Sequence, residues 1–228
     1  MARGADKLRR SIGAVVLATL MVLPTSLPAA AELRLAALGD SLTQGYGLAQ
    51  EDGLVAQLQA HLRDAGLSVT VLNAGVSGDT TAGGLSRLDW TLGDDPDAML
   101  VILGGNDLLR GIDPAASRAN LDAILTRLDA AGVPAMLVGL PAPGNFGPEY
   151  RDAFRAMFND LAEAHDLTLY PDLLDPLTRA QAQGGGQVDA LLQEDRIHPN
   201  AEGVAAIVER FGPAVAEWLD GLPGRGGS

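Results

Sequence analysis

The chain has 228 residues and a formal net charge of −13 at pH 7, with 29 acidic residues against 16 Lys and Arg. Such an acidic surface repels phosphate backbones and no basic cluster offsets it, so nucleic acid is not an expected partner. The sequence contains no cysteine, which excludes a disulfide framework, a thiolate metal site and a lipid-attached thiol.

Residues 1–31 have the pattern of an export signal. Four basic residues precede an apolar run over 12–23, and three alanines at 29–31 suit cleavage. The apolar run is shorter than the ~20 residues that span a bilayer. We therefore expect an exported protein, periplasmic or secreted, with no stable membrane anchor after cleavage. The remaining residues, 32–228, carry a formal charge of −16, from 12 basic and 28 acidic residues, and suffice for one domain.

Short β-rich runs alternate with amphipathic stretches along the rest of the chain. The predicted strands are 33–38, 68–72, 98–103 and 133–140. The predicted helices are 53–64, 81–92, 115–131, 149–165 and 201–219, and the glycines at 184–186 predict a flexible loop. This alternation predicts crossover connections and an α/β fold, with a parallel sheet covered by helices.

Three polar clusters follow the first three predicted strands, at 39–41, 73–78 and 104–107. In an open parallel sheet, ligands bind beyond the carboxyl ends of the strands, so these clusters should share one edge. Gly, Asn, Asp and Ser are also ordinary turn residues. The coincidence of three clusters at one edge nevertheless favours a functional site.

Ser41, in the first cluster, is a candidate nucleophile that needs a base within hydrogen-bond reach. The three histidines are His61, His165 and His198. The first two fall in predicted helices, as ordinary helix residues do. His198 precedes Pro199, which disfavours helical geometry, and Asp195 lies three residues before it. Asp195 could orient the imidazole so that its other nitrogen takes the serine proton, or Asp195 and Pro199 could simply begin the last helix.

Acyl transfer also requires donors for an oxyanion. The candidates are the backbone N–H groups of Ser41 and Gly78 and the side-chain amide of Asn106, each just past a predicted strand. Gly78 could instead serve only the turn before the next helix, and Asn106 could be a left-handed turn residue. We interpret Asp40, Asn73 and Asp107 as supports for these loops.

These residues resemble the four blocks of the SGNH, or GDSL, hydrolases in the right order: GDSL at 39–42, Gly78, GND at 105–107 and Asp195 to His198. The wider strings VSGDTT (76–81) and GGNDLLRG (104–111) resemble the bacterial periplasmic branch of arylesterases, acyl-CoA thioesterases and lysophospholipases. The similarity spans nearly all of residues 32–228.

The resemblance implies a flavodoxin-like three-layer α/β/α sandwich and a serine esterase that needs no metal or cofactor. It assigns Ser41 as nucleophile, His198 as general acid and base, Asp195 as its orienting partner, and Ser41, Gly78 and Asn106 as the oxyanion hole. The expected reaction is hydrolysis of small-molecule carboxylic esters and acyl thioesters through an acyl-serine intermediate. The alternatives are a carbohydrate O-acetylesterase acting on envelope polysaccharide and a catalytically silent ligand-binding module.

Apolar side chains beyond the third and fourth predicted strands could line an acyl pocket. They are Leu108, Leu109, Ile112, Phe146 and Tyr150. The same side chains could instead be ordinary loop anchors. No pattern in the sequence indicates an oligomeric state.

Overall fold

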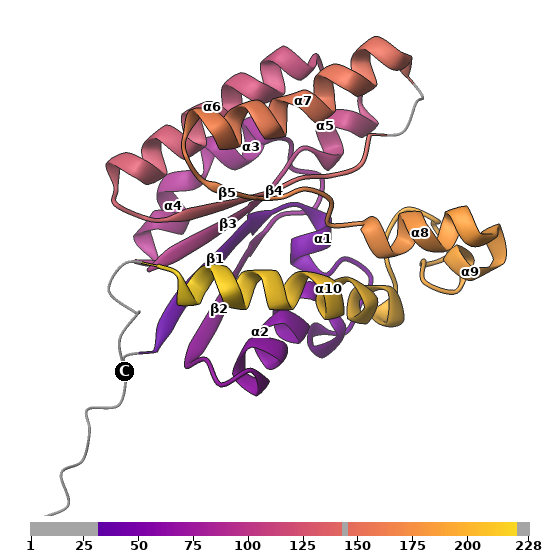
Figure 1. The fold of residues 1–228 in the computed structure, drawn as a ribbon, viewed down its shortest axis with the longest axis horizontal. Helices are drawn as coiled ribbons and strands as arrows, with labels where there is room; N and C mark the ends of the chain where they lie inside the picture. Colours follow the sequence, from indigo (N-terminus) through magenta and orange to yellow (C-terminus); the bar gives the residue numbers. More distant parts are fainter. Residues whose placement is uncertain (1–31, 143–145, 223–228) are drawn as a thin grey trace, which may run out of the picture. The chain divides into compact units, whose positions relative to one another are not determined.

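A computed structural model describes residues 32–142 and 146–222. The predicted export signal, residues 1–31, lies outside the described residues. Five parallel strands form one sheet in the order β2-β1-β3-β4-β5 (Figure 1). The strands are β1 (Leu33–Gly39), β2 (Val69–Gly75), β3 (Ala98–Ile102), β4 (Ala135–Val138) and β5 (Thr168–Tyr170). This is the strand order of a flavodoxin-like sheet, as predicted.

The central strands are buried because helices cover both faces of the sheet. Every residue of β1 except Arg34 is buried, and successive side chains enter opposite layers. Leu35 and Ala37 pack in one apolar cluster, and Ala36 and Leu38 pack in the other. The continuous apolar run that predicted this strand is therefore the expected pattern of a parallel strand between two helical layers.

The longer helices divide between the two faces of the sheet (Figure 1). On one face, α2 (Leu54–Asp64) and α10 (Ala201–Asp220) bury their apolar sides. On the other face lie α4 (Leu88–Gly93), α6 (Pro114–Ala130) and α7 (Pro148–Ala164). Shorter helices complete the described chain: α1 (Ser41–Gln44), the 3₁₀ helix Gln50–Asp52, α3 (Thr81–Ser86), α5 (Gly105–Leu109), α8 (Asp175–Gln183) and α9 (Gly185–Asp189). Within the described ranges, every helix is too short or too polar to cross a lipid bilayer.

The predicted strands and long helices are confirmed, with three differences. The helix expected over 81–92 is two helices, α3 and α4, which meet at Arg87. The prediction of a flexible loop at residues 184–186 is wrong, because helix α9 begins at Gly185. β5 was not predicted, because it has only three residues and lies at the sheet edge with Thr168 exposed.

The sheet contains one switch point, where the chain passes from β2 across β1 to β3. Segments that leave β1 and β3 turn to opposite faces there, and ligands bind in the crevice between such segments. Ser41 follows β1, Gly78 follows β2 and Asn106 follows β3. The fold thus brings the three polar clusters to one edge, as predicted.

Candidate active site

Ser41 is the first residue of α1, immediately beyond the carboxyl end of β1. The Asp40 carboxylate caps this short helix by accepting a hydrogen bond from the Leu42 N–H at 3.0 Å. The helix lies tightly against the strand, because a Cβ atom on Gly39 would be 1.9 Å from Thr43 Oγ1. Glycine at position 39 therefore lets the chain turn at once and places Ser41 at the edge of the sheet.

The Ser41 hydroxyl is joined to the imidazole of His198 and, through it, to Asp195. Ser41 Oγ lies 2.8 Å from His198 Nε2, and His198 Nδ1 lies 2.6 Å from Asp195 Oδ2. With its Nδ1 proton donated to the carboxylate, the ring keeps Nε2 free to accept the serine proton. The side chains of His198 and Asp195 are 18% and 35% exposed, so solvent reaches the pair.

Asp195 also holds the loop that carries His198. Its Oδ1 accepts hydrogen bonds from the backbone N–H groups of Ile197 and His198 at 2.9 and 3.0 Å. The bond from the His198 ring, followed by these two N–H groups, lowers the pKa of Asp195 to about 2. Because this pKa lies below its unfolded value, the ionised carboxylate stabilises the folded chain above the usual carboxyl range. This contribution is lost as the pH falls toward 2.

Gln193 links the histidine loop to the loop after α1. Its Nε2 donates to Tyr46 O at 2.8 Å and to Pro199 O at 2.9 Å, and its backbone N–H donates to His198 O at 2.8 Å. The Tyr46 ring packs on the His198 ring with centroids 4.9 Å apart. Neither Gln193 nor Tyr46 was predicted, because contacts across 147 positions leave no local pattern. The one local signal for Tyr46 is its position as an aromatic residue between two glycines, in the string GYG at 45–47.

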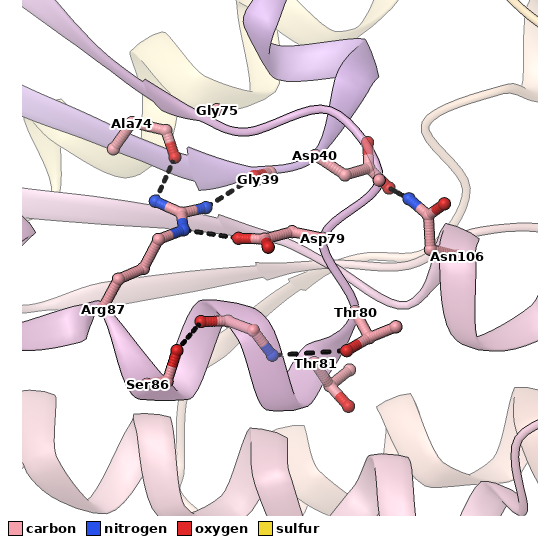
Figure 2. Close-up of polar contacts among 12 residues, drawn as sticks. Gly39, Asp40, Ala74, Gly75, Asp79, Thr80, Thr81, Ser86, Arg87 and Asn106 are labelled. Atoms are coloured by element: carbon pink, nitrogen blue, oxygen red, sulfur yellow. Dashed lines mark hydrogen bonds and ion pairs between the residues drawn. The ribbon is translucent and has the colours of Figure 1, made fainter.

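Three N–H donors lie in the segments that directly follow β1, β2 and β3. Asn106 Nδ2 donates to Asp40 Oδ2 at 3.2 Å, which orients the amide and leaves its second N–H available (Figure 2). Gly78 has a left-handed φ of 83°, and its carbonyl accepts from Arg110 Nη2 at 2.7 Å. Across residues 32–142 and 146–222, the backbone N–H groups of Ser41 and Gly78 have no protein acceptor. Such donors near a nucleophile can stabilise a developing oxyanion.

The chain is similar to known proteins over most of its length. The model of the GDSL-like lipase/acylhydrolase family matches residues 37–206. The chain belongs to this family. Esterase TesA of Pseudomonas aeruginosa is 37% identical over 191 residues, which cover 83% of this chain and 91% of that protein. Thioesterase 1/protease 1/lysophospholipase L1 of Escherichia coli K12 is 35% identical over 201 residues, covering 87% and 86%.

A solved structure extends this similarity to three dimensions. AlinE4, an SGNH-hydrolase family esterase, superposes with a TM-score of 0.67 at 40% identity, covering 84% of this chain and 98% of AlinE4. The family and the fold class predicted from the four sequence blocks are therefore confirmed.

In this GDSL hydrolase, two further polar residues support the loops, as the sequence indicated. Asp107 is buried, and its carboxylate accepts from Thr81 N at 2.8 Å, Thr81 Oγ1 at 2.6 Å and Ser117 Oγ at 2.8 Å. These bonds tie α5 to the start of α3 and to α6. Asn73 Oδ1 accepts from Gly75 N at 3.0 Å, which shapes the end of β2.

The other two histidines of the GDSL hydrolase pack between helices. A Cβ atom on Gly212 of α10 would lie 2.3 Å from His61 Cδ2, so this ring fills the contact between α2 and α10. His165 Nε2 lies 2.8 Å from Asp122 Oδ1 and joins the end of α7 to α6. In the part of the chain that the structure describes, His, Asp and Glu side chains form no group of three that could hold a metal ion.

The five residues predicted to line an acyl pocket occupy different environments. Leu108 is 7% exposed and packs in the core, whereas Leu109 is 60% exposed. Phe146 is 49% exposed and packs on Tyr150 with ring centroids 5.1 Å apart. The Tyr150 hydroxyl donates to Ile112 O at 2.9 Å. The structure thus brings Ile112, Phe146 and Tyr150 together and places Leu108 in the core.

Asp40→Asn tests the electrostatic cost of the helix cap in this GDSL hydrolase. Burial raises the pKa of Asp40, and hydrogen bonds from Leu42 and Asn106 only partly oppose this rise. A carboxyl whose folded-state pKa is raised binds protons more tightly in the folded chain, so ionisation lowers stability as the pH increases. Urea unfolding should show the variant gaining stability relative to wild type as the pH rises from the usual carboxyl pKa of about 4. A difference that stays constant with pH, or one of opposite slope, would contradict this interpretation.

Proposed function

We propose that this esterase hydrolyses small-molecule carboxylic esters and acyl thioesters through an acyl-serine intermediate on Ser41. The observation that carries the proposal is the continuous hydrogen-bonded chain from Ser41 Oγ through His198 to Asp195, with distances of 2.8 and 2.6 Å. A serine hydroxyl is a weak nucleophile, and this arrangement of base and orienting carboxylate is what activates it. Residues 32–228 would form a single SGNH hydrolase domain.

The reaction proceeds in two stages. Ser41 Oγ attacks the substrate carbonyl carbon while His198 Nε2 takes the hydroxyl proton. The tetrahedral intermediate collapses, its bond to the leaving oxygen or sulfur breaks, and His198 protonates the leaving group. Water then attacks the acyl-serine, again losing a proton to His198. The second intermediate collapses to the carboxylic acid, and the proton returns to Ser41 Oγ.

The N–H donors act on the carbonyl oxygen, which becomes negatively charged in both tetrahedral intermediates. Ser41 N–H, Gly78 N–H and the free amide N–H of Asn106 form the oxyanion hole in this proposal. Asp40 fixes the orientation of the amide by accepting its other hydrogen. Prepositioned donors stabilise the transition state without reorganising during the reaction.

Asn106→Ala should lower kcat by roughly 10²- to 10³-fold and change KM little, because the amide bonds a charge that exists only in the transition state. Hydrolysis of p-nitrophenyl butyrate would give both constants. Asn159→Ala is a matched control, since the exposed Asn159 donates its amide only to Arg155 O within α7. A change in KM alone would instead assign Asn106 to substrate binding.

Exposed apolar side chains beyond β3 and β4 are the candidate contacts for the acyl group. Exposed Leu109 and Phe146 lie on the segments that follow β3 and β4, and Phe146 packs against Tyr150. We propose that these side chains, with Ile112, contact the acyl chain. The substrate classes in this proposal are aryl esters, acyl thioesters and lysophospholipids. The signal-like pattern of residues 1–31 supports export to the periplasm or the exterior.

A substrate panel tests the function. Aryl esters, acyl-CoAs, lysophospholipids and acetylated sugars would be assayed in parallel, with a fluorophosphonate as a covalent label for an activated serine. We expect turnover of aryl esters and acyl thioesters together with stoichiometric labelling. Turnover restricted to acetylated sugars would identify the carbohydrate O-acetylesterase alternative. A folded protein without turnover or labelling would be a binding module.

A further inference from the structure

Arg87 lies between α3 and α4, and its side chain reaches the carboxyl ends of β1 and β2 (Figure 2). Nη2 donates to Gly39 O at 2.8 Å, and Nη1 donates to Ala74 O at 2.8 Å. Nε donates to the Asp79 carboxylate at 2.5 Å. One guanidinium group therefore binds three segments: the end of β1, the end of β2 and the loop that leads to α3.

Two of these acceptors lie close in sequence to the proposed oxyanion donors Ser41 and Gly78. Gly39 lies two residues before Ser41, and Asp79 directly follows Gly78. Pairing between β1 and β2 ends at the rung formed by Gly39 and Gly75. Beyond that rung the ladder no longer fixes the separation of the two segments. The guanidinium, with the bond from Val76 N to Gly39 O at 3.1 Å, bridges them at this point.

The chemistry of this contact requires arginine. The side chains of Arg87 and Asp79 are each 19% exposed, so water competes poorly for their hydrogen bonds. A guanidinium directs several N–H groups in fixed directions within one plane, whereas a lysine ammonium is a single flexible point charge. Arg87 also leaves helical geometry, with φ −111° and ψ 8°, where α3 ends and α4 begins. The broken helix thus presents a rigid three-way donor to the strand ends.

We propose that Arg87 is a positioning residue for the oxyanion hole, which sets the spacing between the N–H groups of Ser41 and Gly78. The inference rests on the proposed function, because it takes these two groups to bind the oxyanion. Arg87 acts through the backbone of the two loops and not on the substrate. Displacing donors by a fraction of an ångström weakens transition-state binding while leaving ground-state binding almost unchanged.

Arg87→Lys keeps the charge and removes the planar donor. We expect kcat per active site to fall about 10- to 100-fold, with KM within about twofold of wild type. A trifluoromethyl ketone, which forms a reversible tetrahedral adduct with an active serine, should lose affinity in proportion to kcat/KM. The pH profile should keep its shape, because the contacts of His198 are untouched. Arg127→Lys is the control, since Arg127 forms an exposed ion pair with Asp89 on neighbouring helices.

Active sites would be counted by fluorophosphonate titration, which separates lost protein from lost catalysis. Normal kcat per site and normal ketone affinity in Arg87→Lys would overturn the inference and make Arg87 purely structural. If that variant does not fold, Asp79→Asn replaces it, because it weakens the ion pair at nearly constant shape. Unchanged kcat and ketone affinity in Asp79→Asn would equally overturn it. Failure of the wild-type protein to be labelled would instead contradict the proposed function.

Discussion

Ser41→Ala should lower ester hydrolysis by about 10⁶-fold, the effect expected when a triad nucleophile is lost. The substitution removes one oxygen atom, whose hydrogen bond is made to His198 Nε2. The backbone N–H of residue 41 and the Asp40 cap remain, so the folded structure should be retained. Turnover of p-nitrophenyl butyrate by the purified variant would measure the loss, and circular dichroism would verify the fold.

Covalent labelling identifies the reacting atom in the same experiment. A fluorophosphonate should add to Ser41 of the wild-type protein and leave Ser41→Ala unmodified. Ser86→Ala is a matched control, since the Ser86 hydroxyl donates to Gly83 O within α3, away from His198. Wild-type turnover by a folded Ser41→Ala variant would mean that a different group attacks the ester.

Asp195→Asn should lower kcat by roughly 10⁴-fold through the imidazole tautomer. The asparagine oxygen can still accept from the N–H groups of Ile197 and His198, so the loop should keep its shape. Its NH₂ group would then face His198 Nδ1 and favour the tautomer with the proton on Nε2. That nitrogen could no longer accept the proton of Ser41.

The neighbouring residue provides the control for Asp195. Glu194→Gln makes the same chemical change on an exposed side chain one position earlier, and it should leave kcat near the wild-type value. The activity of both variants would be measured across pH, so that a shift of the pH optimum is not mistaken for a loss of activity. Activity of Asp195→Asn within about tenfold of wild type would assign Asp195 to loop structure and not to orientation of the base.

Sequence patterns predicted the elements whose burial is uniform and the residues whose chemistry is unusual. β1 was predictable because helices cover both of its faces, which requires an unbroken apolar run. The contact between His198 and Asp195 was predictable because Pro199 and Asp195 flank the histidine at short spacing. The connections between loops were not predictable. The bond from Gln193 to Tyr46 joins residues 147 positions apart, and no local pattern specifies such a contact.

The sequence pattern also does not predict the different burial of adjacent residues of the same type. Leu108 and Leu109 are adjacent leucines in one short helix, yet the first is 7% exposed and the second 60% exposed. Packing against the core beneath α5 decides which of them is buried. The break between α3 and α4 at Arg87 also depends on distant residues. The strand carbonyls that accept hydrogen bonds from its side chain lie 13 and 48 positions earlier in the sequence.

The proposed nucleophile and its proposed base lie 157 positions apart in the sequence. A polypeptide still emerging from the ribosome therefore carries an inert serine, and so would a fragment that ends before residue 195. The segment directly before α10 supplies both the imidazole and its carboxylate, in a single turn. Recovery of hydrolysis during refolding should consequently report the docking of that segment. Two co-expressed fragments divided before it should restore turnover when they associate.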